Sequence, residues 1–317
     1  MRPPQEHTIH KAAWLYYGQG MRQEDIAEAL GLSRATVINY LKRARDIGAV
    51  TIRVPAGLFR DDVLARRLED ALGLQMVWVI PDGSDGPAAD FSLAAGMVLL
   101  DLVQPDSLMG LAWGETVYAM VDALPMTEVP GLSILQMCGN LGTSFQYRPD
   151  YCTLEMARRL WAFGENLYAP LVLSSESLAS AIRGEDTVRR QLERLRDCDL
   201  ALFSVGSCGA ESHIVKSGAV SAAELAQLVA AGAVAQVNAR MIGADGAEIA
   251  CPYNRRLIAM ELDDLRRIPK RLCLVSGTEK VPALRAALAG GYVSHLVITG
   301  AVATELGRDL PALDQAT

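Results

Sequence analysis

Polar and basic side chains crowd residues 34–45, a stretch that contains no acidic residue. Amide and guanidinium groups of this kind bind base edges, and Asn39 is suited to bidentate contact with adenine. Lys42 and Arg43 favour phosphates instead, which adds affinity but no sequence information. The residues that we predict to contact DNA are Gln23, Ser33, Arg34, Thr36, Asn39, Tyr40, Lys42 and Arg43.

Two short helices, over residues 23–30 and 34–45, are predicted to position these side chains. Gly31 lies where the chain must turn sharply, because glycine adopts positive φ at little cost. Ser33 is placed to cap the second helix by accepting from backbone N–H groups of its first turn. The apolar residues that share one face of each helix are Ile26, Ala27, Leu30, Val37 and Leu41. The pattern predicts a helix-turn-helix whose second helix lies in the major groove.

An ordinary helical hairpin would show the same apolar spacing, so the flanking segments matter. A further helix over residues 8–18 precedes the pair and supplies packing partners. An extended segment, Thr51–Val54, follows Gly48 as the wing strand of a winged helix would. With the basic second helix, these features favour a winged helix-turn-helix DNA-binding domain over residues 1–55.

Length and charge divide the chain in the same place. Its 317 residues suggest two domains, and half of them are hydrophobic, enough for a sizeable core. The net charge is −7, but residues 1–55 carry +3 and residues 56–317 carry −10. A basic head on an acidic body is expected when only the head meets phosphate. Because +3 is modest, we expect several heads to act together in a homo-oligomer.

Composition also excludes several classes of protein. No apolar run approaches the roughly 18 residues of a membrane helix, and the first residues lack an apolar signal core. Six scattered cysteines without a C-x-x-C pair suggest neither a zinc site nor a disulfide framework. We therefore expect a cytoplasmic protein with reduced thiols, which binds no membrane and needs no metal or cofactor.

Residues 56–317 form the second predicted domain, which begins with a connector helix over residues 56–73. Apolar segments then alternate with helical ones, which predicts an open α/β fold with a mostly parallel sheet covered on both faces. The predicted strands are 75–80, 107–112, 132–138, 167–173, 199–205, 256–262, 271–276 and 295–299. The predicted helices are 88–103, 114–123, 151–163, 185–196, 221–230 and 278–289.

Ligands of such sheets bind beyond the carboxyl ends of the strands, in the loops that lead into helices. The candidate loops, rich in small residues, are 110–116, 137–142, 204–209, 232–240, 276–280 and 299–304. Lys280 could pair there with a phosphate or carboxylate, or it could be a solvated lysine. The predicted effector-binding residues are Gly114, Glu115, Asn140, Ser207, Gln236 and Lys280.

Catalytic signals are weak by comparison. His213 and His295 have no partner at metal-ligand or triad spacing, and we assign no catalytic residue and no metal ligand. Glu115 is the one candidate base for an enzyme acting on sugar phosphates, the alternative that we keep open.

Taken together, these segments resemble the SorC family of sugar-responsive bacterial transcription regulators. The resemblance covers essentially the whole chain and is carried by residues 15–54, 109–117, 168–173, 201–207, 232–246 and 276–306. It implies a Rossmann-like effector domain related to phosphosugar isomerases and deaminases, which binds its effector without turning it over. It also implies tetramers that bind operator DNA, and a phosphate-binding role for Lys280.

The chain departs from the family pattern at two positions of the effector domain and in the recognition helix. Gln236 replaces a common Asp, and Thr299 stands where an acidic step is common. Ile38 and Asn39 replace a frequent Ser-Arg, so the operator can differ from those of relatives. We expect a regulator, a repressor or an activator, of a carbohydrate or polyol catabolic operon. Its effector would be a sugar, a sugar phosphate or a polyol, and the AAWLYY segment resembles regulators of polyol operons, erythritol operons among them. The alternative is a phosphosugar isomerase-like or deaminase-like enzyme with a DNA-binding head.

Overall fold

The computed structural model describes residues 4–50, 63–82, 87–142, 147–209, 211–308 and 310. The chain divides into two compact units, Met1–Val54 and Pro55–Thr317. The domain boundary predicted at residue 55 and the predicted wing strand Thr51–Val54 both lie outside the described residues. The two units are considered separately below.

The N-terminal unit is helical. It contains α1 (Pro4–Ala13), the π-helical turn η1 (Trp14–Gly18), α2 (Gln23–Leu30) and α3 (Arg34–Asp46). The predicted helix over residues 8–18 is thus an α-helix that begins earlier and changes to π-helical geometry at Trp14. Its core contains Ala12, Ile26, Ala27, Val37 and Leu41, each less than a tenth exposed.

The connection between α2 and α3 is as predicted. Gly31 has φ +64°, a left-handed conformation that glycine adopts readily. Ser33 Oγ accepts a hydrogen bond of 3.1 Å from the Thr36 backbone N–H, which caps α3. The helix-turn-helix prediction is confirmed.

A seven-stranded sheet forms the centre of the C-terminal unit, and all its strand pairs are parallel. In spatial order its strands are β1 (Met76–Ile80), β10 (His295–Thr299), β9 (Lys270–Val275), β5 (Leu200–Phe203), β2 (Leu108–Leu111), β3 (Ser133–Gln136) and β4 (Phe163–Glu165). The interior strands are buried on both faces, which explains their continuous apolar runs.

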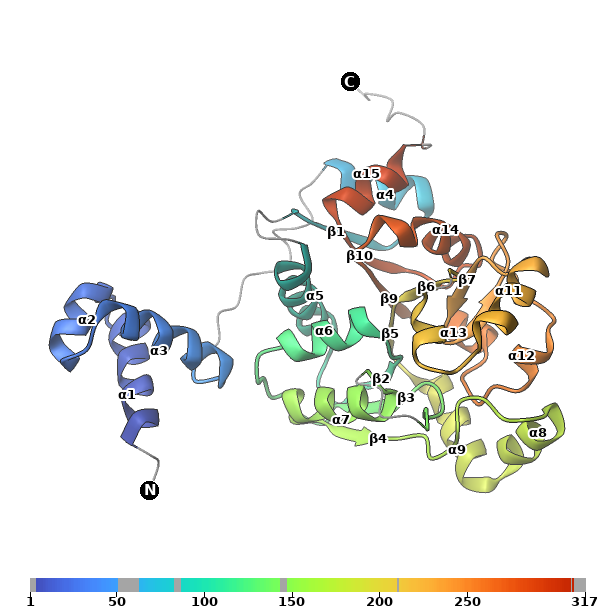
Figure 1. The fold of residues 1–317 in the computed structure, drawn as a ribbon, viewed down its shortest axis with the longest axis horizontal. Helices are drawn as coiled ribbons and strands as arrows, with labels where there is room; N and C mark the ends of the chain where they lie inside the picture. The colour runs from blue at the N-terminus through green and yellow to red at the C-terminus, as the bar shows by residue number, and fades with distance from the viewer. Residues whose placement is uncertain are drawn as a thin grey trace. The chain divides into compact units, whose positions relative to one another are not determined.

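Helices cover both faces of this sheet (Figure 1). One face packs against α5 (Pro87–Leu102), α6 (Glu115–Ala123) and α7 (Pro149–Leu160). The other packs against α4 (Val63–Leu72), α13 (Leu262–Arg267), α14 (Val281–Ala289) and α15 (Gly300–Gly307). The predicted α/β class is confirmed. The remaining elements are α8 (Glu176–Gly184), α9 (Asp186–Arg194), η3 (Leu195–Asp197), α10 (His213–Lys216), α11 (Ala222–Ala230), α12 (Pro252–Arg255) and η4 (Thr278–Lys280).

The predicted connector helix is part of the core. Residues 63–72 form α4, and residues 56–62 lie outside the described part of the chain. Ala65 and Leu68 are fully buried against the sheet, and Glu69 Oε1 accepts a hydrogen bond of 2.7 Å from the Val77 N–H. This helix is therefore fixed to β1.

A second, antiparallel sheet corrects one of the predicted loops. Its strands are β6 (Val205–Ser207), β7 (Ala235–Val237) and β8 (Arg240–Ile242). Residues 232–240, expected to be a loop leading into a helix, instead form β7 and the turn into β8. Asn238 and Ala239 both have positive φ, as the central residues of a two-residue hairpin turn do.

Two predicted strands are wrong. Residues 167–173 and 256–262 make only isolated bridges, among them Val172 with Leu257. Most of their apolar side chains are buried in two clusters outside the main sheet, although Met260 and Leu262 join the main core and Tyr168 is exposed. β3 pairs with β2 on one side and with β4 on the other, and the sequence of β4, FGE, contains a single apolar side chain.

Candidate DNA-binding surface and effector cavity

The inward face of α3 determines which of its side chains remain available. Val37, Leu41 and Ala44 are buried at helical spacing and fix the rotation of the helix. Asn39 and Lys42 point away from this face and are exposed. The helix can therefore offer an amide and a cation to DNA without disturbing its core.

The other predicted DNA contacts divide by their surroundings. Arg34 and Arg43 are exposed, and Arg34 pairs with Glu24 at 3.0 Å. Tyr40 is half-buried against the core of the unit, so only part of its ring is available. Ser33 and Thr36 bond to each other at the start of α3, and Gln23 is half-buried at the first position of α2.

One exposed large apolar residue of α3 was missing from the predicted set. Ile38 is 44% exposed and lies beside Asn39 on the outward side of the helix. An apolar side chain at this position can contact the methyl group of thymine. The spacing of Val37 and Leu41 was sufficient to place Ile38 outward, beside Asn39.

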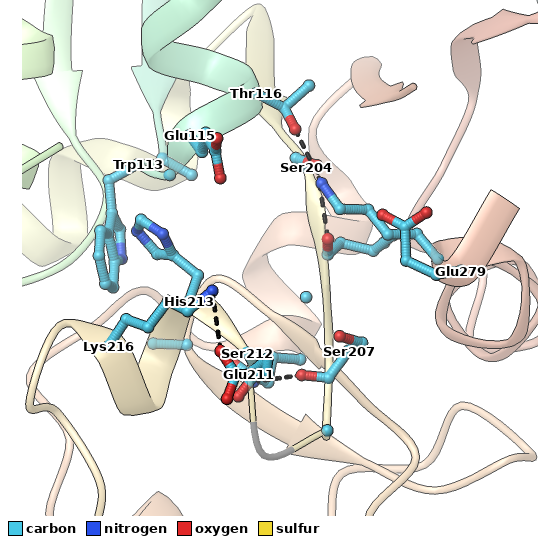
Figure 2. Close-up of a pocket in the computed structure, with 18 of the residues that line it drawn as sticks. Trp113, Glu115, Thr116, Ser204, Ser207, Glu211, Ser212, His213, Lys216 and Glu279 are labelled. Atoms are coloured by element: carbon cyan, nitrogen blue, oxygen red, sulfur yellow. Dashed lines mark hydrogen bonds and ion pairs between the residues drawn. The ribbon is translucent and has the colours of Figure 1, made fainter. Parts of the chain in front are cut away.

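In the C-terminal unit, a cavity of about 340 Å³ lies at the carboxyl ends of the central strands β2, β5 and β9. Ala112, Ser204 and Lys280 follow those strands and line it. The hairpin of β7 and β8 and helix α10 complete its wall. In Figure 2, Trp113 and His213 lie side by side across the cavity from Thr116 and Ser204. The volume suits a small ligand.

Lys280 is the best-placed cation of this cavity. Its Nζ donates a hydrogen bond of 2.8 Å to Thr116 Oγ1 in the first turn of α6. Burial lowers the pKa of the Lys280 ammonium, although Glu279 and Glu115 oppose that shift. Gly114 provides no side-chain cap for α6, and Gly114, Glu115 and Thr116 at its N-terminus line the cavity. A cation and a helix N-terminus together form an environment for an anion.

The opposite wall is aromatic and neutral. The rings of Trp113 and His213 are 4.7 Å apart. Burial, assisted by the charges of Lys280 and Lys216, lowers the pKa of His213 to about 4. Its imidazole is therefore uncharged at neutral pH. Lys216 forms an exposed ion pair with Glu211 at 3.4 Å.

The β7–β8 hairpin supplies amide groups. Gln236 Nε2 donates to the Ser207 carbonyl at 3.0 Å, which holds this amide beside β6. Asn238 is 95% buried, and its Nδ2 donates to the Met137 carbonyl at 3.2 Å. Hydroxyl-bearing ligands are bound by neutral groups of this kind.

Comparison with known proteins gives this arrangement a family. Residues 58–306 match the family described as "Putative sugar-binding domain", and residues 14–46 match Sigma-70, region 4. The chain belongs to the SorC family of transcriptional regulators. It is a DNA-binding regulator with a sugar-binding domain.

Relatives match over nearly the full length of the chain. It is 29% identical over 305 residues to the uncharacterized transcriptional regulator YjhU of Escherichia coli strain K12, with 92% of each chain covered. It is also 29% identical over 314 residues to the deoxyribonucleoside regulator of Bacillus subtilis strain 168, covering 98% of this chain and 99% of the relative. The full-length sorbitol operon regulator SorC of Klebsiella pneumoniae has a similar fold, with a TM-score of 0.71, 23% identity, and 96% and 99% coverage.

The SorC-family cavity brings together most of the predicted effector residues. Gly114, Glu115, Ser207, Gln236 and Lys280 all line it. The sixth, Asn140, does not. Its Oδ1 accepts from Gln136 Nε2 at 2.8 Å and its Nδ2 donates to the Leu167 carbonyl, so this amide joins two loops. The predicted loop 299–304 is instead the start of α15, capped by Thr299, and Gly300 and Thr304 line a separate cavity with Asp82.

Several lining residues of this site were not among the predicted ones, among them Thr116, Trp113, His213 and Asn238. Trp113 precedes two predicted residues and could have been found from the loop itself. His213 and Asn238 could not, because their placement depends on α10 and on the hairpin. In the described part of the chain, no cluster of His, Cys, Asp or Glu could hold a metal ion, and no helix is long and apolar enough to cross a membrane.

Proposed function

We propose that this regulator controls a carbohydrate or polyol catabolic operon, and that its effector is a phosphorylated sugar or polyol bound in the 340 Å³ cavity. The bond between Lys280 and Thr116 carries the proposal, because it holds an ammonium group at the uncapped N-terminus of α6. A phosphate there would meet the Lys280 ammonium group and a helix N-terminus that no side chain caps.

The remaining lining residues fit the hydroxyl groups of such an effector. Gln236, Ser207 and Glu115 can accept or donate hydrogen bonds without adding positive charge. Trp113 and His213 provide two aromatic rings, inclined at 51° to each other, against which the carbon-bound hydrogens of a sugar could pack. Names of relatives such as the deoxyribonucleoside regulator and the sorbitol operon regulator support a carbohydrate class.

At the other end of the chain, α3 would enter the major groove, with Asn39 and Ile38 at base edges and Lys42 at phosphates. The modest charge of residues 1–55 supports a homo-oligomer, a tetramer in our proposal, in which several heads bind one operator. Such a protein would act in the cytoplasm, where the operator is accessible.

We propose no turnover of the effector. A general base for isomerisation or deamination would need a carboxylate with a pKa adjusted by burial. The carboxylates among the described lining residues, Glu115, Glu211 and Glu279, are all exposed. The enzyme alternative would therefore need a base from outside these three residues.

A paired thermal-shift screen tests this function. The full chain is mixed with ribose 5-phosphate, glucitol 6-phosphate, inorganic phosphate, ribose or glucitol, and a ligand that binds raises its melting temperature by mass action. We expect a phosphorylated member to raise it more than its unphosphorylated counterpart. A hit should then change the affinity for operator DNA, without loss of ligand from the mixture. Stabilisation by neutral compounds alone would contradict the phosphate assignment.

A further inference from the structure

A group of exposed aromatic side chains surrounds β4, the edge strand of the seven-stranded sheet. Trp161, Phe163 and Tyr168 are 70%, 65% and 80% exposed. Single exposed apolar residues are common, but a contiguous group marks an interaction site. Neither the cavity nor the helix-turn-helix uses these rings. We call Trp161, Phe163 and Tyr168, together with Leu154 of α7, the edge face.

Apolar groups lie on both sides of the edge strand. A β-carbon at Gly164 would come within 2.9 Å of Ala157 Cβ and 3.7 Å of Leu154 Cδ2, so this residue faces α7. Successive strand residues point to opposite sides, and Phe163 therefore faces away from α7. There it lines a groove of about 510 Å³ with Tyr168 and residues of α9. A strand added to β4 would be covered on both sides, as interior strands of this sheet are.

The backbone at Trp161 supports a role outside the folding of the monomer. Trp161 follows the last residue of α7 with φ +52° and ψ +35°. This left-handed position usually holds glycine, and it is unfavourable for a bulky side chain. A ring that is 70% exposed gains little burial in return. Strain of this kind points to a function for the side chain.

The charges around the edge face indicate which partner fits it. The basic side chains here are paired with acidic ones, as in Arg158–Glu155, Arg194–Glu165 and Arg190–Asp186. This region is therefore locally neutral, on a domain whose net charge is −10. Two such domains repel each other elsewhere, and a neutral face lets like-charged copies approach. A strongly basic or acidic partner would find no complementary field.

We propose that the edge face binds the same face of a second copy of this chain, with the two β4 edges side by side across a two-fold axis. An edge strand is a ready template for pairing, and a two-fold contact uses the same patch twice. An aromatic side chain offers roughly 150–250 Å². The exposed areas of these three rings and of Leu154 (52% exposed), added over both copies, approach the roughly 1,000 Å² of buried surface that a specific interface needs.

Sedimentation of the full chain over a concentration series tests the interface. Trp161→Gly removes the ring and relieves the left-handed strain, so it should leave the fold intact while weakening association. Phe163→Lys places a charge on the other side of the strand. Val229→Lys is the matched control, because Val229 is a 44% exposed apolar residue of α11, outside the edge face. Far-ultraviolet circular dichroism verifies that each variant is folded.

We expect both edge-face variants to raise the dissociation constant of one assembly step by about tenfold or more, as loss of an aromatic anchor does. The control should assemble like the unsubstituted chain. Two results would overturn the proposal. One is an unsubstituted chain that sediments as a monomer at every concentration. The other is unchanged assembly of folded Trp161→Gly and Phe163→Lys.

Discussion

Replacing Lys280 by methionine gives the sharpest test of the effector site. The substitution keeps an unbranched side chain that is shorter by one atom, and it removes the ammonium group that now donates to Thr116 at 2.8 Å. A hydrogen bond to a charged group contributes about 1.5–3 kcal/mol, so the dissociation constant of a phosphorylated effector should rise by roughly 10- to 150-fold. Because burial lowers the pKa of Lys280, the charged form is disfavoured in the fold. The ligand-free variant should therefore be at least as stable as the parent.

Titration calorimetry with the best phosphorylated hit of the thermal-shift screen measures the loss, and thermal unfolding without ligand measures the stability. Lys216→Met is the control, since Lys216 also lines the cavity but is already paired with the exposed Glu211. An exposed pair of this kind contributes little, so its removal should change affinity by no more than about fivefold. Equal losses in the two variants, or no loss at Lys280, would refute the assignment of the anion site.

Three further predictions address recognition, folding and pH. Asn39→Ala should lose roughly 1–3 kcal/mol of discrimination at one base pair per half-site, whereas Lys42→Ala should weaken binding to all sequences and flatten the salt dependence of binding. Gel-shift titrations on operator and random DNA distinguish the two variants. Identical behaviour of the two variants would contradict these roles. Gly31→Ala should cost about 1 kcal/mol, because φ is +64° and no atom lies within 4 Å of the added carbon. Faster hydrogen exchange in α2 and α3 of the full chain would report that cost, and unchanged exchange would argue against it. The pKa of His213 is lowered from 6.5 to about 4, so the unfolded chain binds more protons between these values, and stability should fall as pH decreases from 6.5 to 4. The loss should be about 2–3 kcal/mol by urea titration and should be reduced in His213→Phe; equal acid sensitivity of both proteins would exclude His213 as its source.

Local patterns were sufficient for most of the architecture. Six of the eight predicted strands correspond to strands of the large sheet, because buried parallel strands have continuous apolar runs that need no knowledge of their neighbours. The turn at Gly31 and the cap at Ser33 were predictable for a similar reason, since each depends on residues within one helical turn.

Tertiary context decided the elements that were missed. Residues 167–173 are as apolar as a strand. Leu167, Ala169 and Leu173 pack in a small cluster outside the main sheet, and the backbone of the segment makes only isolated bridges. The strand β4 has little apolar character in its sequence, FGE, and its single apolar side chain, Phe163, is exposed at the edge of the sheet. Strand propensity indicates that a segment is buried, but it does not identify the element that packs against that segment.

The effector site shows the same limit at the level of single residues. Asn140 and Asn238 are alike in sequence, since each is an amide near small residues. Asn140 is occupied in joining two loops, whereas Asn238 is brought to the cavity by a hairpin turn. Lys280 was predictable because it lies in the connection that follows β9, and the carboxyl end of a parallel strand lies at the site whatever the rest of the fold does.

A chain of aromatic rings joins this cavity to the surface of α7. The ring centroids of Trp113 and His213 are 4.7 Å apart, those of His213 and Tyr147 are 5.9 Å apart, and those of Tyr147 and Tyr118 are 5.0 Å apart. Tyr118 in turn stacks at 5.8 Å on Tyr151, a partly exposed residue of the same helix that carries Leu154 of the edge face. Packed rings resist compression, so a ligand that displaces His213 must also move its neighbours. Coupling between the cavity and the α7 surface through these rings would be reciprocal. Effector binding would change the association constant of α7 surfaces by the same factor by which association changes the affinity for effector.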